Sequence, residues 1–79
     1  MIVKLLVFGI FTDIFGANQV DFELPTPINV GQLKAFIAKK FPQTEALNFA
    51  IAVDETYADD DLIINENQII ALIPPVSGG

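Results

Sequence analysis

The first residues of the chain alternate in the manner of a β-strand. Residues 2–8 are rich in β-branched and aliphatic side chains, and Gly9 ends the run. Successive side chains of a strand point to opposite faces of its sheet. One face is therefore expected in the core, and it carries Val3, Leu5 and Val7. The other face carries Lys4, Leu6 and Phe8.

A second strand is predicted in the stretch QVDFELP, residues 19–25, where apolar and acidic residues alternate. The inward positions are Val20, Phe22 and Leu24, and the outward positions are Asp21 and Glu23. Pro25 and Pro27 end this strand, because proline cannot donate a hydrogen bond to the ladder. Only a loop that contains Gly16, Ala17 and Asn18 separates the two strands, so we expect them to pair as a β-hairpin.

The period changes to that of a helix in the stretch NVGQLKAFIAKKFP, residues 29–42. Asn29 is the expected N-cap, and Gln32 stands where it completes a capping box. The apolar stripe consists of Val30, Leu33, Ile37 and Phe41, with Phe36 at its edge. Lys39 and Lys40 favour the helix dipole in the last turn, and Pro42 ends the helix.

Three further strands are predicted in the second half of the chain. Residues 48–55 form one with Phe49, Ile51 and Val53 inward, residues 56–58 form a short edge strand, and residues 68–73 form the last, after a turn at 66–68. The order of elements predicts an α+β fold, with one helix packed on a mixed sheet of four to five strands. No repeat or linker interrupts it, so residues 1–73 are expected to be one domain and residues 74–79 an extended tail.

The last strand also suggests a partner surface. If Ile70 and Leu72 are in the core, their neighbours point to the open face of the sheet: Ile69, Ala71 and Ile73. Leu6 and Phe8 are expected on the same face, with Tyr57 beside them. A contiguous apolar patch next to the tail would mark an interface, and Phe8, Tyr57 and Ile73 are the predicted contact residues.

Composition excludes most catalytic chemistry for this chain. It has no cysteine and no histidine, four lysines against ten acidic residues, and a net charge of −6. Neither a phosphate-binding glycine loop nor an activated serine is present, since Ser77 is the only serine. The acidic run Asp54–Asp61 lacks the glycine and closing glutamate of a calcium loop, so a solvated loop without metal is expected. The charge argues against nucleic acid; the apolar start is too short to span a membrane, and a cytoplasmic protein is expected.

The chain ends in Pro74-Pro75-Val76-Ser77-Gly78-Gly79. A frayed terminus is one interpretation of this tail. The two prolines favour a stiff, extended course instead, and six residues reach roughly 20 Å. Glycine lets other groups approach the main chain closely. The tail therefore suits insertion into a narrow channel of another protein.

The tail and the order of elements resemble the small, sulfur-carrying subunits of molybdopterin synthase, a MoaD/ThiS-type ubiquitin-like family with the β-grasp fold. The resemblance covers the whole chain: LLVFG, VGQLKAFIAKKFP, IAVDE and, most specifically, PPVSGG. The chain departs from the family at Asp54, where an asparagine is usual, and at Thr12-Asp13, where an Arg-Glu pair is common. These departures concern positions of expected partner contacts and leave the tail untouched.

The resemblance implies a function in which the terminal carboxylate of Gly79 is the reactive group. A ubiquitin-activating-type adenylyltransferase would adenylate it with ATP, and a sulfur donor would convert it to a thiocarboxylate. The large subunit of molybdopterin synthase would then use that sulfur on a pyranopterin precursor, in an assembly expected to be a heterotetramer. The chain itself would bind no cofactor and would be no enzyme.

Two other functions stay open at this point. The chain could carry sulfur for another pathway, such as thiamine synthesis, tRNA thiolation or cysteine synthesis. It could also be an interaction module or ubiquitin-like modifier whose terminus forms amide bonds with lysine. A modifier would accumulate as lysine-linked conjugates and a carrier as a thiocarboxylate.

Overall fold

The structure, a computed structural model, describes residues 1–74 of the chain. Its strands are β1 (Ile2–Val7), β2 (Gln19–Glu23), β3 (Ala50–Val53), β4 (Thr56–Tyr57) and β5 (Ile69–Ile73). Its helices are α1 (Ile10–Phe15), α2 (Val30–Lys40) and the 3₁₀ helix η1 (Pro42–Ala46).

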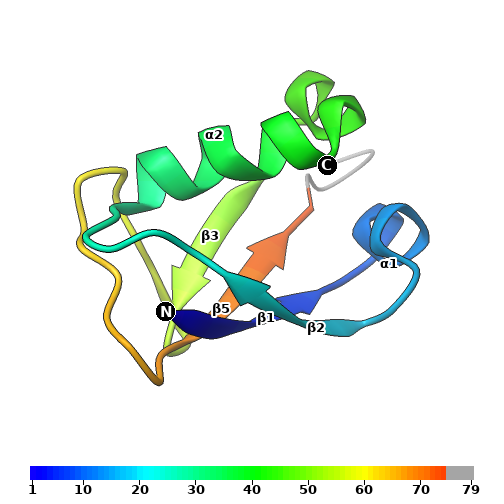
Figure 1. Ribbon diagram of the computed structural model, residues 1–79. Coiled ribbons are helices and arrows are strands. Elements are labelled where there is room, and N and C mark those ends of the chain that lie inside the picture. The colour runs from blue at the N-terminus through cyan, green and yellow to red at the C-terminus, as the bar shows by residue number, and fades with distance from the viewer. Residues whose placement is uncertain (75–79) are drawn as a thin grey trace.

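The strands form one mixed sheet in the order β2-β1-β5-β3-β4, and α2 lies across one face of it (Figure 1). The pairs β1–β2, β3–β4 and β3–β5 are antiparallel, whereas β1 and β5 run parallel at the centre. The predicted α+β layout and the hairpin of the first two strands are therefore confirmed.

The core lies between the sheet and α2. The inward side chains of the two central strands are almost completely buried: Val3, Leu5, Val7, Ile70 and Leu72. The helix contributes Val30, Leu33 and Ile37, each 0% exposed. The alternation in the sequence thus assigns the faces of β1 and β5 correctly, because only one face of this sheet has a helix to pack against.

The start of α2 has the predicted capping box. The Oδ1 atom of Asn29 accepts a hydrogen bond from the Gln32 main-chain N–H at 2.7 Å. The Oε1 atom of Gln32 accepts one from the Asn29 N–H at 2.9 Å. At the other end Phe41 is the C-cap, and Pro42 begins η1 directly after it.

Helix α1 was not predicted from the sequence, which led us to expect a loop there. It has six residues, too few for a periodic pattern to stand out. Two features of the sequence mark this helix. Phe11 is followed one turn later by two more apolar residues, Ile14 and Phe15. Gly16 ends the helix in the left-handed conformation, with a φ of 75°. Phe11 is completely buried and packs edge-on against Phe49 with ring centroids 5.1 Å apart. The structure therefore contains α1 and η1 in addition to α2, the one helix that was predicted.

All five strands are shorter than predicted, and the differences at β1 and β3 bear on the site. The first strand ends at Val7, one residue before Phe8. The strand expected at residues 48–55 comprises only Ala50–Val53, and Phe49 lies just before it. At its other end β3 stops at Val53 because the turn of the β3–β4 hairpin follows. In this turn Asp54 and Glu55 have φ values of 49° and 70°, which are outside the range of β-strand residues.

Asp54 ties this hairpin turn to the start of β5. Its Oδ1 atom accepts a hydrogen bond from the Ile69 main-chain N–H at 2.9 Å. We expect Asp54→Ala to lower the free energy of unfolding by about 1 kcal/mol, since the carboxylate accepts hydrogen bonds from the Ile69 N–H and from the Gln68 side chain, and both are lost. Asp54→Asn keeps an acceptor and suits positive φ, so it should be nearly neutral. Urea unfolding of both variants checks this; equal losses would show that the acceptor is not what matters.

Candidate partner-binding face and the base of the tail

The face of the sheet turned away from α2 carries a row of apolar side chains. Strand register places Leu6 opposite Ala71, Ala71 opposite Ala52, and Ala52 opposite Tyr57. Residues directly opposite each other in a sheet present their side chains on the same face. This row therefore crosses the sheet from β1 to the edge strand β4.

A second, shorter row lies next to the first at the end of the sheet where the tail begins. Ile73 is opposite Ala50. Phe8 follows Val7, whose partner is Leu72, so Phe8 comes beside Ile73. We use the term open-face patch for the apolar side chains of the two rows: Leu6, Phe8, Ala50, Ala52, Tyr57, Ala71 and Ile73.

All three predicted contact residues fall within the open-face patch. Phe8 is 48% exposed and Tyr57 is 72% exposed, while Ile73 is half-buried between neighbouring strands. The predicted face of each residue is confirmed. Binding of a partner at this face remains a prediction.

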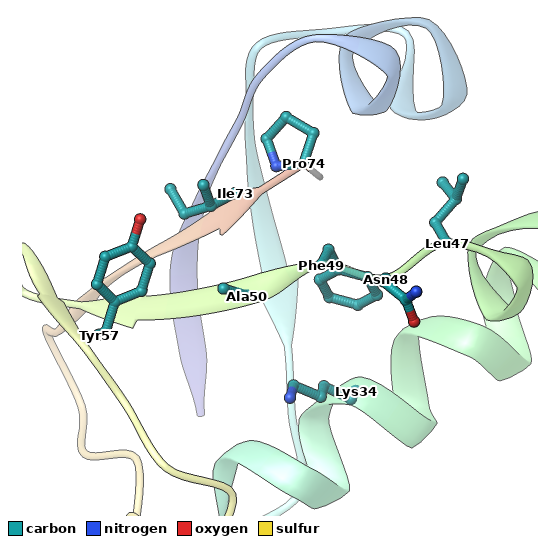
Figure 2. Close-up of a pocket in the computed structure, with 8 residues that line it drawn as sticks. All are labelled: Lys34, Leu47, Asn48, Phe49, Ala50, Tyr57, Ile73 and Pro74. Carbon is teal, nitrogen blue, oxygen red and sulfur yellow. The ribbon is translucent and has the colours of Figure 1, made fainter. Parts of the chain in front are cut away.

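Two hollows flank the Phe8–Ile73 end of the patch. One, the edge groove, has a volume of about 510 Å³ and wraps around the edge of β3 (Figure 2). It is lined by Lys34, Leu47, Asn48, Phe49, Ala50, Tyr57, Ile73 and Pro74. The other has about 490 Å³ and is lined by residues of β1, α1 and the start of β2, including Phe8, Gly9 and Thr12. A partner surface with two projections, one for each hollow, would fit this part of the surface.

The base of the tail is held at this same end of the sheet. Pro74 is half-buried and lines the edge groove. Gly9 has φ 57° and ψ −130°, a conformation that favours glycine. A Cβ atom at Gly9 would lie 3.2 Å from the Pro74 Cγ atom, so the missing side chain leaves room for the proline ring. The predicted reactive segment, Pro75 and Val76 through Ser77 and Gly78 to Gly79, lies outside the described residues.

The structure shows where the two departures from the family pattern lie. Thr12 is half-buried on α1 and lines the hollow next to Phe8, whereas Asp13 is exposed. Asp54 serves the hairpin turn at the other end of β3. Thr12 is thus the departure that borders the open-face patch.

The acidic run Asp54–Asp61 comprises the β3–β4 turn, the edge strand β4 and the start of the loop after it, and most of its residues are exposed. Its one ion pair within residues 1–74 joins the Asp60 Oδ1 atom to the Lys34 Nζ atom at 2.9 Å. The main-chain carbonyl of Asp60 also accepts a hydrogen bond from the Gly31 N–H at the start of α2. No cluster of three metal-binding side chains occurs among the described residues. None of the described helices is long and apolar enough to cross a membrane.

The roles of several residues in this region were not predicted from the sequence. Ala50 is a small residue on the open face, and it lines the edge groove together with Tyr57. Gly9 was treated only as the end of a strand. Lys34 was one of four lysines without a distinguishing pattern. Their roles depend on which strands are neighbours, which local sequence does not reveal.

Comparison with protein families supplies the decisive observation. The model of the ThiS family matches residues 5–79 of the chain. The chain belongs to the ThiS family. A relative in Dictyostelium discoideum, named molybdopterin synthase sulfur carrier subunit, is 33% identical over 96% of this chain and 94% of its own length.

Solved structures agree with this assignment. A Pyrococcus furiosus chain, assigned as molybdopterin converting factor subunit 1, superposes with a TM-score of 0.86 over 96% of this chain and 99% of its own. At 23% identity it establishes the ubiquitin-like β-grasp fold and no more. A Helicobacter pylori chain, 26% identical with a TM-score of 0.67, covers all of both chains and comes from a complex of subunits 1 and 2 of molybdopterin-converting factor.

Proposed function

We propose that this ThiS-family chain is the small, sulfur-carrying subunit of a molybdopterin synthase. The observation that carries the proposal is its end-to-end match, at 33% identity, to a molybdopterin synthase sulfur carrier subunit. The Helicobacter pylori complex adds that a related chain pairs with a second subunit. The open-face patch beside the start of the tail offers this chain a surface for such a partner.

The proposed reaction takes place at the terminal carboxylate of Gly79. A carboxylate at the end of a chain ordinarily has a pKa of about 3.5 and is an anion at neutral pH, and an anion is a poor electrophile. A separate adenylyltransferase joins it to the AMP part of ATP and releases pyrophosphate. A sulfur donor then displaces AMP, so that one oxygen of the carboxylate is replaced by sulfur. Transfer of this sulfur to the pterin precursor, with water supplying oxygen, regenerates the carboxylate.

The body of the protein, on this proposal, positions the tail and leaves catalysis to its partners. Pro74 lies next to Gly9 at the border of the open-face patch. A partner that covers the patch therefore receives the tail from a defined starting point. We propose that the large subunit binds there and that two copies of each subunit form a heterotetramer.

The isolated chain is expected to neither bind nor hydrolyse ATP. It has no phosphate-binding glycine loop, and its net charge of −6 opposes a polyanion. Isothermal titration of the purified chain with ATP and magnesium should show no saturable heat. Saturable binding to the chain alone would contradict the carrier role, because activation is assigned to a separate enzyme.

Reconstitution tests the proposed function itself. The chain is incubated with an activating enzyme, ATP and a sulfur source, and then mixed with the large subunit and the pyranopterin precursor. We expect dithiolene-containing pterin to form in proportion to the carrier supplied. A carrier that becomes thiocarboxylated and yields no pterin product would instead indicate service to another sulfur pathway.

A further inference from the structure

Pro74 is the first residue after β5 and lies close to the junction between β1 and α1. Figure 2 shows it at the end of β5, directly after Ile73, which is still paired with Ala50. A Cβ atom at Gly9 would lie 3.2 Å from the Pro74 Cγ atom and 3.7 Å from its Cβ atom. The first separation is shorter than nearly all contacts of real Cβ atoms, and the second is an ordinary contact. A side chain at position 9 and the outer part of the Pro74 ring would therefore compete for one space.

The main chain at Gly9 has little freedom to yield in this competition. The Gly9 carbonyl accepts a hydrogen bond from the Thr12 N–H at 3.0 Å, and the Phe8 carbonyl accepts one from the Phe11 N–H at 3.1 Å. The side chain of Phe11, in the same turn, is 0% exposed. Pro74 in contrast is half-buried and follows the last paired residue of its strand. A side chain at position 9 would consequently displace Pro74.

Two glycines at the ends of α1 separate the effect of space from that of conformation. Gly9 has φ 57° and Gly16 has φ 75°, and side chains are disfavoured at both values. Around Gly16, apart from its chain neighbours, no atom of residues 1–74 lies within 4 Å of a Cβ built there. Both positions thus favour glycine through their conformation, but only Gly9 also leaves room for another residue.

The position of the Pro74 ring affects the whole tail. The ring fixes φ of its own residue, so a displaced ring also turns the main chain that leaves it. Five further residues span roughly 17 Å when extended. A small rotation at Pro74 is magnified over that length, and a misplacement of only about 1 Å at the reacting atoms can cost a factor of about 10² in rate.

We propose that Gly9 is a positioning residue for sulfur transfer. Its missing side chain lets the Pro74 ring lie beside the β1–α1 junction, and this sets the direction in which the tail leaves the sheet for the large subunit. Gly9 supplies no group to the reaction and acts through Pro74 alone. This inference rests on the proposed function and deepens it.

Single-turnover transfer of sulfur tests the inference. Each carrier is first thiocarboxylated to the same extent, checked by mass spectrometry, and is then mixed with saturating large subunit and the pyranopterin precursor. Saturation removes differences in affinity from the measured rate. We expect Gly9→Ala to slow the transfer about tenfold, because the tail starts from a displaced Pro74. Gly16→Ala is the matched control and should stay within about twofold of wild type, although both variants unfold at lower temperature.

A double-mutant cycle with Pro74→Ala shows whether Gly9 acts through the proline ring. Pro74→Ala removes the Cγ atom and keeps the Cβ atom, whose distance from a Cβ at Gly9 is an ordinary 3.7 Å. Alone it should slow transfer about threefold, because φ of residue 74 is no longer fixed. In this background Gly9→Ala should change the rate by less than about twofold, since coupled residues are not additive.

An NMR measurement on the wild-type chain covers the case in which Gly9→Ala does not fold. A nuclear Overhauser cross-peak between the Gly9 Hα and Pro74 Hγ protons is expected in the free chain and in the complex with the large subunit. Absence of this cross-peak from the complex would overturn the inference, because Pro74 would then have left Gly9 before transfer.

The other outcomes separate this inference from the proposed function. Equal rates for Gly9→Ala and Gly16→Ala would show that the space at Gly9 has no part in transfer. The same loss from Gly9→Ala with and without the Pro74 ring would show that Gly9 acts through its own conformation or through Phe8. Either result leaves the carrier function standing, whereas a wild-type thiocarboxylate that yields no pterin product would contradict the function itself.

Discussion

Removal of Gly79 is expected to abolish sulfur transfer while leaving the fold intact. Every side chain of the described core lies between Val3 and Leu72, so the deletion takes nothing from it. The terminal carboxylate would fall one residue, roughly 3.5 Å, short of the reacting atoms. A misplacement of only about 1 Å can cost a factor of about 10² in rate. The measurement is pterin product formed with the large subunit, with wild-type and truncated carriers treated identically.

Gly79→Ala is the control for tail length. It keeps the reach of the tail and adds one methyl group, so its loss of product should be smaller than that of the deletion. Urea unfolding of all three proteins should give the same midpoint. Product at the wild-type level from the truncated protein would show that the sulfur is not carried at this terminus.

Phe8→Asp is expected to weaken binding to the large subunit by about 100-fold, the loss typical of a central apolar contact. Phe8 is 48% exposed and lies beside Ile73 on the open face. A carboxylate there must be desolvated when an apolar partner surface covers it, which costs several kcal/mol. Thermal unfolding should change little, because Phe8 is not part of the buried core. Titration calorimetry with the purified large subunit gives the affinity.

Leu62→Asp is the matched control for this variant. Leu62 is 43% exposed, similar to Phe8, and lies in the loop that contacts the start of α2, outside the open-face patch. Its replacement should leave binding within about twofold of wild type, as expected for a site outside the interface. Equal losses in the two variants would mean that net charge, and not the patch, governs binding.

Periodic patterns predicted the parts of the fold that depend on local sequence. The capping box at Asn29, the buried face of β1 and the outward direction of Ile73 all follow from spacing alone. Helix α1 escaped prediction because six residues between two glycines are too short for a period to be distinguished from a loop. Strand order escaped for another reason: the parallel pairing of β1 with β5 joins opposite ends of the chain.

The candidate site divides in the same way. The tail motif and the faces of Phe8, Tyr57 and Ile73 were readable, because proline, glycine and strand alternation have direct consequences for the backbone. The edge groove was not predicted from the sequence, because it depends on β4 being two residues shorter than its neighbour β3. The contact of Gly9 with Pro74 likewise joins residues that are far apart in sequence.

Mass spectrometry of the intact protein, isolated from its native cell, tests the central claim most directly. The carrier account predicts a fraction of molecules heavier by the difference between one sulfur and one oxygen atom, with the added mass located on Gly79 in the C-terminal peptide. An alkylating reagent selective for thiocarboxylates should shift this fraction and leave the remainder unchanged. A protein found only with an unmodified terminus and as amide conjugates to lysines of other proteins would contradict the account and identify a modifier.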